Sequence, residues 1–352
     1  MDKKILFTLL LITSLILFLG CTNLGIEVTC PDGEVVNDIR DCVDENKLIP
    51  TQPKTPPRPT QKTVQAITTC QELQNITDLT SNYILENNID CTDTINWNNG
   101  AGFAPLATFT GTLNGQGFTI TDLYINRPTS KEVGLFSRTN NATITNLGIA
   151  NTTIIGKENV GGLIGRAENT SVDNIHYSGE INGWGGVGGI IARGTNTTIT
   201  NSSNAGTITS SIIGHNRARG TGGITGYCDT CIISKSYNTG NIYGNKDLGG
   251  IAGQTQETQI MTVYNTGDIN WGHGVDWPYF FGGIVGTMRD STIRNAYNTG
   301  TIYGNSYGSG IAGYMQGDIA ITNVYNRGHI IQINESVGGL IGGLASDSTL
   351  TL

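Results

Sequence analysis

The sequence predicts an all-β protein: a right-handed parallel β-helix, a three-faced solenoid of about eight coils, with a small N-terminal α/β cap. The chain has 49 Gly among 352 residues and only 14% charged residues, a composition typical of repetitive β architecture. From residue 134 onward one unit recurs at intervals of 27 to 34 residues. Copies of the unit carry a Gly-Gly-aliphatic motif and a Tyr-Asn-x-Gly-x-Ile motif, so one repeat is expected to form one coil.

The first 20 residues read as an export signal. Lys3 and Lys4 precede an apolar run from Ile5 to Leu19, which is too short for a comfortable membrane span. Gly20-Cys21 then resembles the end of a lipoprotein signal peptide, in which cleavage before Cys21 leaves its thiol to carry the lipid. An ordinary secretory signal or an uncleaved anchor are the alternatives. We expect an exported protein, held at the cell surface through a lipid in the membrane.

The other six cysteines predict three local disulfides: Cys30 with Cys42, Cys70 with Cys91, and Cys228 with Cys231. In an oxidising compartment each pair would close a short loop and restrict the unfolded chain. The alternative for Cys228 and Cys231 is a metal site. No second close pair follows them at zinc-type spacing, so we expect neither a metal nor a cofactor.

Composition divides the rest of the chain into four segments. Residues 21–47 hold the lipid-anchored Cys and a small disulfide loop, and residues 48–63 form a linker with five of the nine prolines. In residues 64–104, Leu73, Ile76 and Leu79 recur at near-helical spacing ahead of a short strand, which predicts a cap over the first rung. Residues 105–352 are the predicted β-helix.

Stacked coils place equivalent residues directly above one another, about 4.8 Å apart. The asparagines of the second motif therefore form one column, in which amide side chains can hydrogen-bond from rung to rung: Asn204, Asn238, Asn265, Asn298 and Asn326. Glycines form further columns, where turns approach closely, and are architectural rather than phosphate-binding. The aliphatic residue after each Gly-Gly is expected to fill the interior.

The Gly-Gly-Leu-Ile-Gly unit at 161–165 and the Tyr-Asn-Thr-Gly unit at 237–240 resemble GLUG-motif repeats. Such repeats occur in secreted adhesin-like proteins and in the non-catalytic part of some surface proteases. The resemblance covers residues 70–352, including a lead-in at 102–128 that is similar to the sequence often found before such repeats. It implies an adhesin-like surface lipoprotein, and it is specific for architecture more than for function.

Two of the repeats are longer than the others, at 34 and 33 residues. Both carry their additional residues at the same turn of the coil, within 209–221 and 270–281. Both insertions emerge along one edge, about 10 Å apart, beside exposed aromatic residues. Aromatic faces next to polar side chains suit a sugar. The candidate ligand-binding residues on this edge are Trp184, His215, Arg217, Arg219, Lys246, Asp247, Trp271, His273, Asp276, Trp277 and Tyr279. Alternatively Trp271, Trp277, Phe280 and Phe281 fold back as a satellite hydrophobic cluster.

The expected function is non-catalytic adhesion, with a cell-surface glycan or protein as the ligand. The net charge of −8 excludes a phosphate-binding footprint over the whole chain, so nucleic acid is not an expected partner. Parallel β-helices also host lyases and glycoside hydrolases, but the carboxylates here are mostly single and no catalytic motif is present. A carbohydrate-active enzyme acting from the insertion edge and a purely structural envelope component remain the alternatives.

Overall fold

The computed structural model describes residues 28–29, 35–36, 64–211, 220–272, 280–304, 307–332 and 337–352. The chain divides into two units, Met1–Gln61 and Lys62–Leu352. In the first unit, β1 (Val28–Thr29) pairs antiparallel with β2 (Val35–Val36). The predicted signal peptide, lipidated Cys21, the Cys30 and Cys42 pair, and the linker at 48–63 lie outside the described residues.

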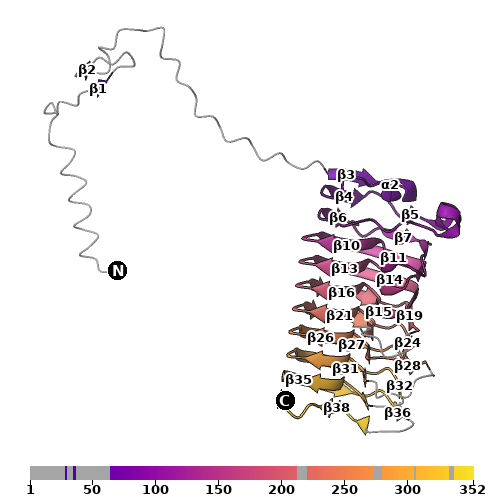
Figure 1. Cartoon of the computed structure of the whole chain (residues 1–352), viewed down its shortest axis with the longest axis vertical. Helices are drawn as coiled ribbons and strands as arrows, with labels where there is room; N and C mark the ends of the chain where they lie inside the picture. The colour runs from indigo at the N-terminus through magenta and orange to yellow at the C-terminus, as the bar shows by residue number, and fades with distance from the viewer. Residues whose placement is uncertain are drawn as a thin grey trace. The chain divides into compact units, whose positions relative to one another are not determined.

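The second unit is a β-solenoid of about nine turns, in which strands of successive turns pair in parallel (Figure 1). This confirms the predicted fold class. Two of its three sheets have eight strands each. Sheet A contains β10 (Phe136–Asn140), β13 (Ile164–Glu168), β16 (Ile191–Thr195), β21 (Thr225–Asp229), β26 (Ala252–Gln256), β30 (Val285–Arg289), β34 (Ala312–Gln316) and β38 (Ile341–Leu344).

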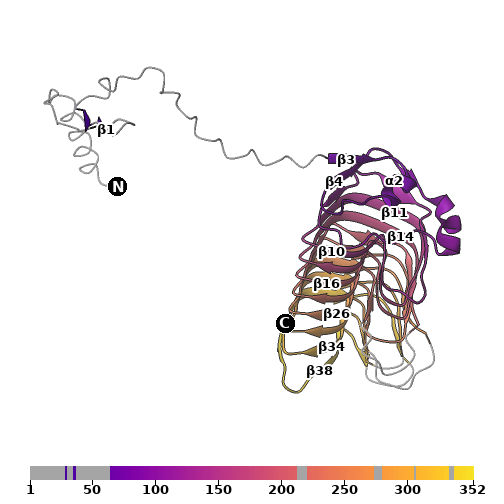
Figure 2. The same cartoon turned by 45° about the horizontal axis from the view of Figure 1, so that its top comes forward.

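Sheet B precedes sheet A in every turn, and a tight bend at the Gly-Gly motif joins the two. It contains β9 (Lys131–Val133), β12 (Glu158–Gly161), β15 (Gly185–Gly188), β20 (Thr221–Gly222), β25 (Leu248–Gly249), β29 (Phe281–Gly282), β33 (Gly308–Ser309) and β37 (Val337–Gly338). The turned view in Figure 2 shows strands of sheet A, among them β10, β16, β26, β34 and β38, stacked along the solenoid.

Sheet C forms the rest of the wall with strands that bend, so that one long strand faces several short ones. For example, β11 pairs in turn with β6, β7 and β8. The upper strands are β3 (Val64–Ile67), β4 (Asn82–Leu85), β5 (Ile89–Asp90), β6 (Thr112–Asn114), β7 (Thr119–Thr121), β8 (Tyr124–Asn126), β11 (Thr143–Ile155), β14 (Ser171–Gly183), β17 (Thr198–Thr200), β18 (Ser203–Asn204) and β19 (Thr207–Ser210). The lower strands are β22 (Ile232–Ser234), β23 (Tyr237–Asn238), β24 (Ile242–Gly244), β27 (Gln259–Asn265), β28 (Ile269–Trp271), β31 (Thr292–Asn298), β32 (Ile302–Gly304), β35 (Asp318–Asn326), β36 (Ile330–Gln332) and β39 (Thr349–Thr351).

The segment predicted as a cap is built into the stack. Its helical residues form α2 (Cys70–Gln74) and a 3-10 segment, η2 (Thr92–Gly100). Thr69 and Glu72 cap the N-terminus of α2 with a capping box. However, β3 pairs in parallel with β4, and β4 pairs in parallel with β6. The solenoid therefore begins before residue 105, which accounts for about nine turns where the repeats alone predicted about eight.

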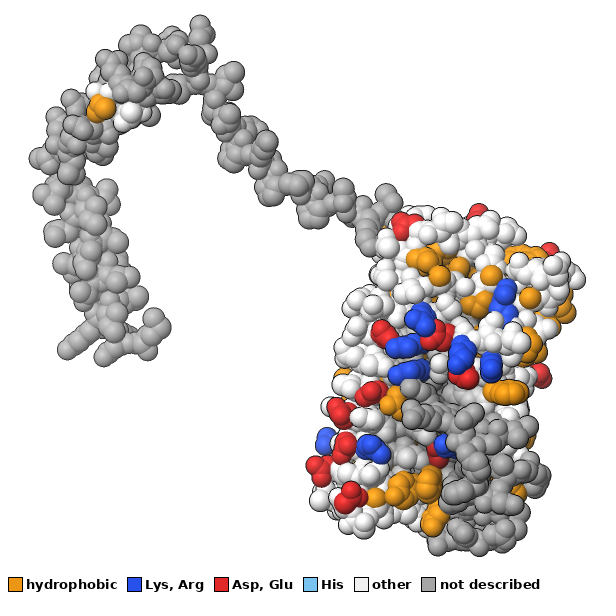
Figure 3. Space-filling view, viewed as in Figure 1, with side chains coloured by type: hydrophobic (Ala, Val, Ile, Leu, Met, Phe, Trp, Pro, Cys, Tyr) orange, Lys and Arg blue, Asp and Glu red, His pale blue; other side chains and the backbone are white. Residues whose placement is uncertain are grey.

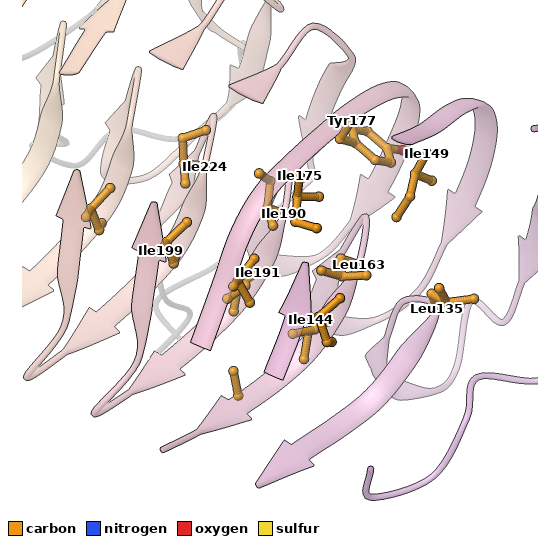
Figure 4. Close-up of a cluster of buried hydrophobic side chains, with 14 of the residues drawn as sticks. Leu135, Ile144, Ile149, Leu163, Ile175, Tyr177, Ile190, Ile191, Ile199 and Ile224 are labelled. Carbon is orange, nitrogen blue, oxygen red and sulfur yellow. The ribbon is translucent and has the colours of Figure 1, made fainter. Parts of the chain in front are cut away.

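Aliphatic side chains from all sheets fill the interior. The residue after the Gly-Gly, or its equivalent, is fully buried in every coil before the last, where Leu340 is exposed. Four of these residues form a row along the stack in Figure 4: Leu135, Leu163, Ile190 and Ile224. Ile144 and Ile199 point into the same space from sheet C. The prediction that one aliphatic residue per coil occupies the interior is confirmed.

The asparagine column forms as predicted and is buried. Each Nδ2 donates to the Oδ1 of the asparagine one turn on, at 2.6 Å from Asn204, 2.7 Å from Asn238 and 2.8 Å from Asn265. The second N–H of the same Nδ2 donates to the carbonyl oxygen two residues ahead, as from Asn265 to Gly267 at 2.8 Å. Asn204, Asn238, Asn265 and Asn298 have no exposed surface, yet both of their amide donors are satisfied.

The second glycine of each pair makes room for this ladder. A Cβ on Gly250 would lie 2.2 Å from the carbonyl oxygen of Gly283 and 2.3 Å from Cγ of Asn265. No side chain can occupy that space, because neither the backbone nor the packed amide can retreat. In the upper coils the ladder gives way to Tyr177, which packs against Gly162 and hydrogen-bonds Thr152 at 2.7 Å.

Two of the three predicted disulfides are present, and the third lies outside the described residues. Cys70 at the start of α2 bonds Cys91. Cys228 and Cys231 close the turn after β21 with a Cα–Cα distance of 5.8 Å, inside the solenoid. A Cβ on Gly194, one turn earlier, would lie 3.0 Å from the Cys228 sulfur. Across the described residues, no helix is both long and apolar enough to cross a membrane.

The glycine column can be tested with two substitutions at the same repeat position. We expect Gly250→Ala to lower the free energy of unfolding by about 2 to 3 kcal/mol through overpacking. Gly339→Ala is the matched control, because nothing lies within 4 Å of its Cβ. Thermal unfolding followed by circular dichroism measures both. Equal losses of stability in the two variants would contradict this account of the column.

Candidate binding surface

Seven of the residues predicted to bind a ligand lie outside the described residues: His215, Arg217, Arg219, His273, Asp276, Trp277 and Tyr279. The other four are placed by the structure and do not form one group. Trp184 is 57% exposed, Lys246 is half-buried, and Asp247 is only 3% exposed. Trp271 packs against a cluster of buried side chains that includes Phe281. For Trp271 and Phe281 the arrangement is therefore the satellite cluster, the alternative drawn from the sequence.

Trp184 presents its ring to solvent just ahead of β15. Its backbone N–H donates to the carbonyl oxygen of Lys157 at 2.7 Å, which holds the turn in the stack. The Lys157 ammonium lies over the indole ring, 5.7 Å from its centroid, as in a cation–π pair. The result is a large, flat apolar surface with a positive charge beside it.

A line of side chains runs between sheets A and B, and we call it the seam. One side of the seam is formed by the outward residues of sheet A, which are in register from turn to turn: Arg138, Arg166, Arg193, Tyr227, Gln254, Thr287 and Tyr314. The other side is formed by the equivalent flanking residue of sheet B in each turn: Glu132, Asn159, Gly186, Gly220, Asp247, Phe280 and Tyr307.

A flanking residue reaches the outward residues of its own turn and of the next. Glu132 forms ion pairs with Arg138 in its own turn and with Arg166 in the next. Asp247 accepts a hydrogen bond from Gln254 of its own turn. These carboxylates compensate cations or satisfy polar groups of the wall. On the face seen in Figure 3, Lys and Arg side chains gather among Asp and Glu side chains in the upper half of the solenoid.

Sequence reasoning missed this seam, although a signal was present. Arg138, Arg166 and Arg193 occupy the same place in three successive repeats, two residues after Phe136, Ile164 and Ile191. Comparison of equivalent repeat positions does not reveal the carboxylates that pair with these arginines. Glu132 precedes the Gly-Gly equivalent, and only the bend between sheets B and A brings its side chain to the arginines.

Tyrosines form a second outward column, on sheet C. Tyr237, Tyr264, Tyr297 and Tyr325 stack with ring centroids 4.7, 5.0 and 5.1 Å apart and nearly parallel planes. Each precedes an asparagine of the buried ladder, and successive residues of a strand point to opposite faces. The Tyr-Asn motif therefore encodes an outer aromatic stack and an inner amide ladder together.

The described residues include no group of three or more His, Cys, Asp or Glu side chains that could hold a metal ion. Burial raises the pKa of the Asp247 carboxyl, while the charge of Lys246 and the hydrogen bond from Gln254 oppose that rise. Asp247 thus acts within the wall of the solenoid and does not present an exposed carboxylate to a ligand.

Comparison with known proteins supports the fold and leaves the family open. No family model matches the chain. A stretch of 109 residues, 29% of this chain, is 42% identical to halomucin of Haloquadratum walsbyi, and the match covers 1% of halomucin. Among solved structures, an IgA1 protease aligns at a TM-score of 0.56 and 19% identity, over 73% of this chain and 21% of that chain. The likeness to the protease shows a shared fold.

A weaker structural match is PfbA, a surface adhesin of Streptococcus pneumoniae. It aligns at a TM-score of 0.27 and 12% identity, over 81% of both chains. That TM-score is too low to show a shared fold. The similarity of the repeats to GLUG motifs stays a prediction from the sequence.

The buried Asp247 predicts a pH-dependent stability difference. Since its native pKa is raised, the folded state holds the proton more tightly than the unfolded chain, and this stabilisation is lost as the pH rises through the native pKa. We expect Asp247→Asn to raise the unfolding temperature relative to the wild type at pH 7 by more than at pH 4. Glu257→Gln, at an exposed carboxylate that also has positive φ, is the control. A difference that is the same at every pH would show that the native pKa of Asp247 is not raised.

Proposed function

We propose that this chain is an exported, lipid-anchored surface protein whose solenoid serves as a non-catalytic binding module for glycans or other surface ligands. The signal-like N-terminus with Cys21 supports export and anchoring. The two disulfides fit an oxidising compartment. The solenoid supplies a rigid wall on which outward side chains repeat at about 4.8 Å.

The observation that carries the proposal is the exposed ring of Trp184. A tryptophan that is 57% exposed loses little entropy on binding, because its turn is hydrogen-bonded into the stack. Its face suits the C–H surface of a sugar, and the Lys157 ammonium is placed to meet a polar substituent. The carboxylates of the seam are engaged within the wall, which favours binding over acid–base chemistry.

Substitution of Trp184 tests the binding role. We expect Trp184→Ala to weaken binding of the full chain to its glycan on an array by about 30-fold or more, because aromatic anchors contribute about 2 kcal/mol or more. Trp184→Phe should retain most of the binding. Ile232→Ala, at another exposed apolar residue of the wall, is the control. Unchanged binding by folded Trp184→Ala, or turnover of the glycan by the wild type, would contradict the proposal.

The anchor is tested separately. In a host that lipidates exported proteins, we expect the wild type to incorporate labelled fatty acid and to partition into the detergent phase. The Cys21→Ser variant should do neither, because the lipid requires the thiol. Labelling of the serine variant, or export of an unlabelled wild type, would show that Cys21 is not the anchor.

A further inference from the structure

The flanking side of the seam has a glycine in two successive turns, and the first of them is the turn of Arg193. Gly185 and Val187 are in register with Glu158 and Val160 of the turn before, which puts Gly186 at the place of Asn159. One turn earlier still, that place is held by Glu132. At the turn of Arg193 the flanking residue thus has no side chain, and Gly220 follows it in the next turn.

The contacts of the equivalent flanking residues in other turns indicate what a side chain at position 186 would reach. Glu132 contacts the outward residues of its own turn and the next. Asp247 bonds Gln254 of its own turn. Phe280 likewise stacks on Tyr314 of the next turn, with ring centroids 4.5 Å apart. A carboxylate beside Gly186 would therefore lie between Arg193 and Tyr227.

Arg193 differs from the two arginines above it. Arg138 pairs with Glu132, and Arg166 pairs with Glu132 and with Glu168 at 2.5 Å. Within the described residues Arg193 forms no ion pair. The buried Nε has no hydrogen-bond partner in either Arg166 or Arg193, so the missing ion pair is what sets Arg193 apart. Its guanidinium lies over the Tyr227 ring, 5.8 Å from the centroid.

The surroundings of Arg193 favour an external anion. Three arginines in register on parallel strands repel one another unless carboxylates intervene. Burial and the charge of Arg166 both lower the pKa of Arg193, against weaker opposing effects of Tyr227, Asp229 and Glu168. In the same three turns Lys131 pairs with Glu158, and the Lys157 ammonium lies over the Trp184 ring. A bound carboxylate would supply the charge that Glu132 supplies two turns earlier.

We propose that the gap at Gly186 binds a carboxylate of an acidic sugar, with Arg193 as the anion-binding residue and Trp184 as the platform for the sugar ring. Trp184 lies just ahead of β15, two residues before Gly186 and within about 7 Å of it along the chain, a distance that one sugar residue spans. The planar guanidinium matches a carboxylate bidentately. This inference rests on the proposed function and narrows its ligand to uronic-acid-type glycans.

The test measures binding of the full chain to polygalacturonate at fixed ionic strength. We expect Arg193→Gln to weaken the affinity by about tenfold or more, because a charge-assisted hydrogen bond is lost. Arg289→Gln is the matched control: it removes the same charge from sheet A at an arginine that bonds Gln316. Its affinity should stay within about twofold of the wild type.

A second pair of variants acts from the opposite side of the gap. Gly186 has φ +65°, and the equivalent positions accept Asn159 at φ 55° and Asp247 at φ 43°. Gly186→Asp places a built-in carboxylate beside Arg193 and should bind at least tenfold more weakly than Gly186→Asn, which differs from it only in charge. Equal affinities for the two variants, or equal losses in Arg193→Gln and Arg289→Gln, would overturn the proposal.

Three further probes separate the ligand classes. Dextran, poly-L-glutamate and dextran sulfate stand for a neutral glycan, an acidic peptide and a sulfated glycan. Binding of poly-L-glutamate or dextran sulfate that is as tight and as dependent on Arg193 would overturn the acidic-sugar assignment. Trp184-dependent binding of dextran without binding of polygalacturonate would overturn this inference and leave the proposed function intact. Binding of no glycan at all would overturn both.

Discussion

The structure depends on the contact between the asparagine ladder and the glycine column. A parallel solenoid must satisfy the polar groups that it buries, and an unsatisfied buried amide costs about 1 to 3 kcal/mol. Asn238 and its equivalents meet that requirement because each amide bonds its own turn and the next. The amides reach that geometry only because Gly223 and its equivalents leave no side chain in the way. The two columns therefore fix the register of the turns from Asn204 to Asn326.

Register is what turns the repeats into surfaces. Once the turns are aligned, any outward residue that recurs becomes a column, as the stacked tyrosines of sheet C and the arginines of sheet A show. Whether a column of identical residues stabilises the solenoid depends on the charge of the side chain. Neutral rings stack at about 5 Å and add stability. Arginines at the same spacing require counter-charges, and the wall provides carboxylates for some of these arginines only.

The seam shows how the wall meets that requirement and where it does not. Glu132 compensates the first two arginines, and Asp247 satisfies polar groups farther down. Between them, the glycine at 186 leaves Arg193 facing a tyrosine ring. A ligand that brings its own carboxylate fits this place because the protein already uses carboxylates for the same purpose in neighbouring turns. The exposed Trp184 beside it connects this electrostatic feature with sugar recognition.

The sequence by itself determined the fold class, the coil spacing, the asparagine ladder and two disulfide pairings, because each of these is periodic or local along the chain. It did not determine that residues 64–104 join the stack, since β3 and β4 lack the repeat motifs and their pairing is visible only in space. It placed Asp247 and Trp271 on a ligand edge, whereas the bend between sheets and the packing around Phe281 turn both toward the protein. Trp184 kept the exposure expected of it. Only the tertiary structure brought Glu132 to Arg138 and left Arg193 without a counterpart, because those contacts cross between sheets and turns, where sequence spacing carries no information.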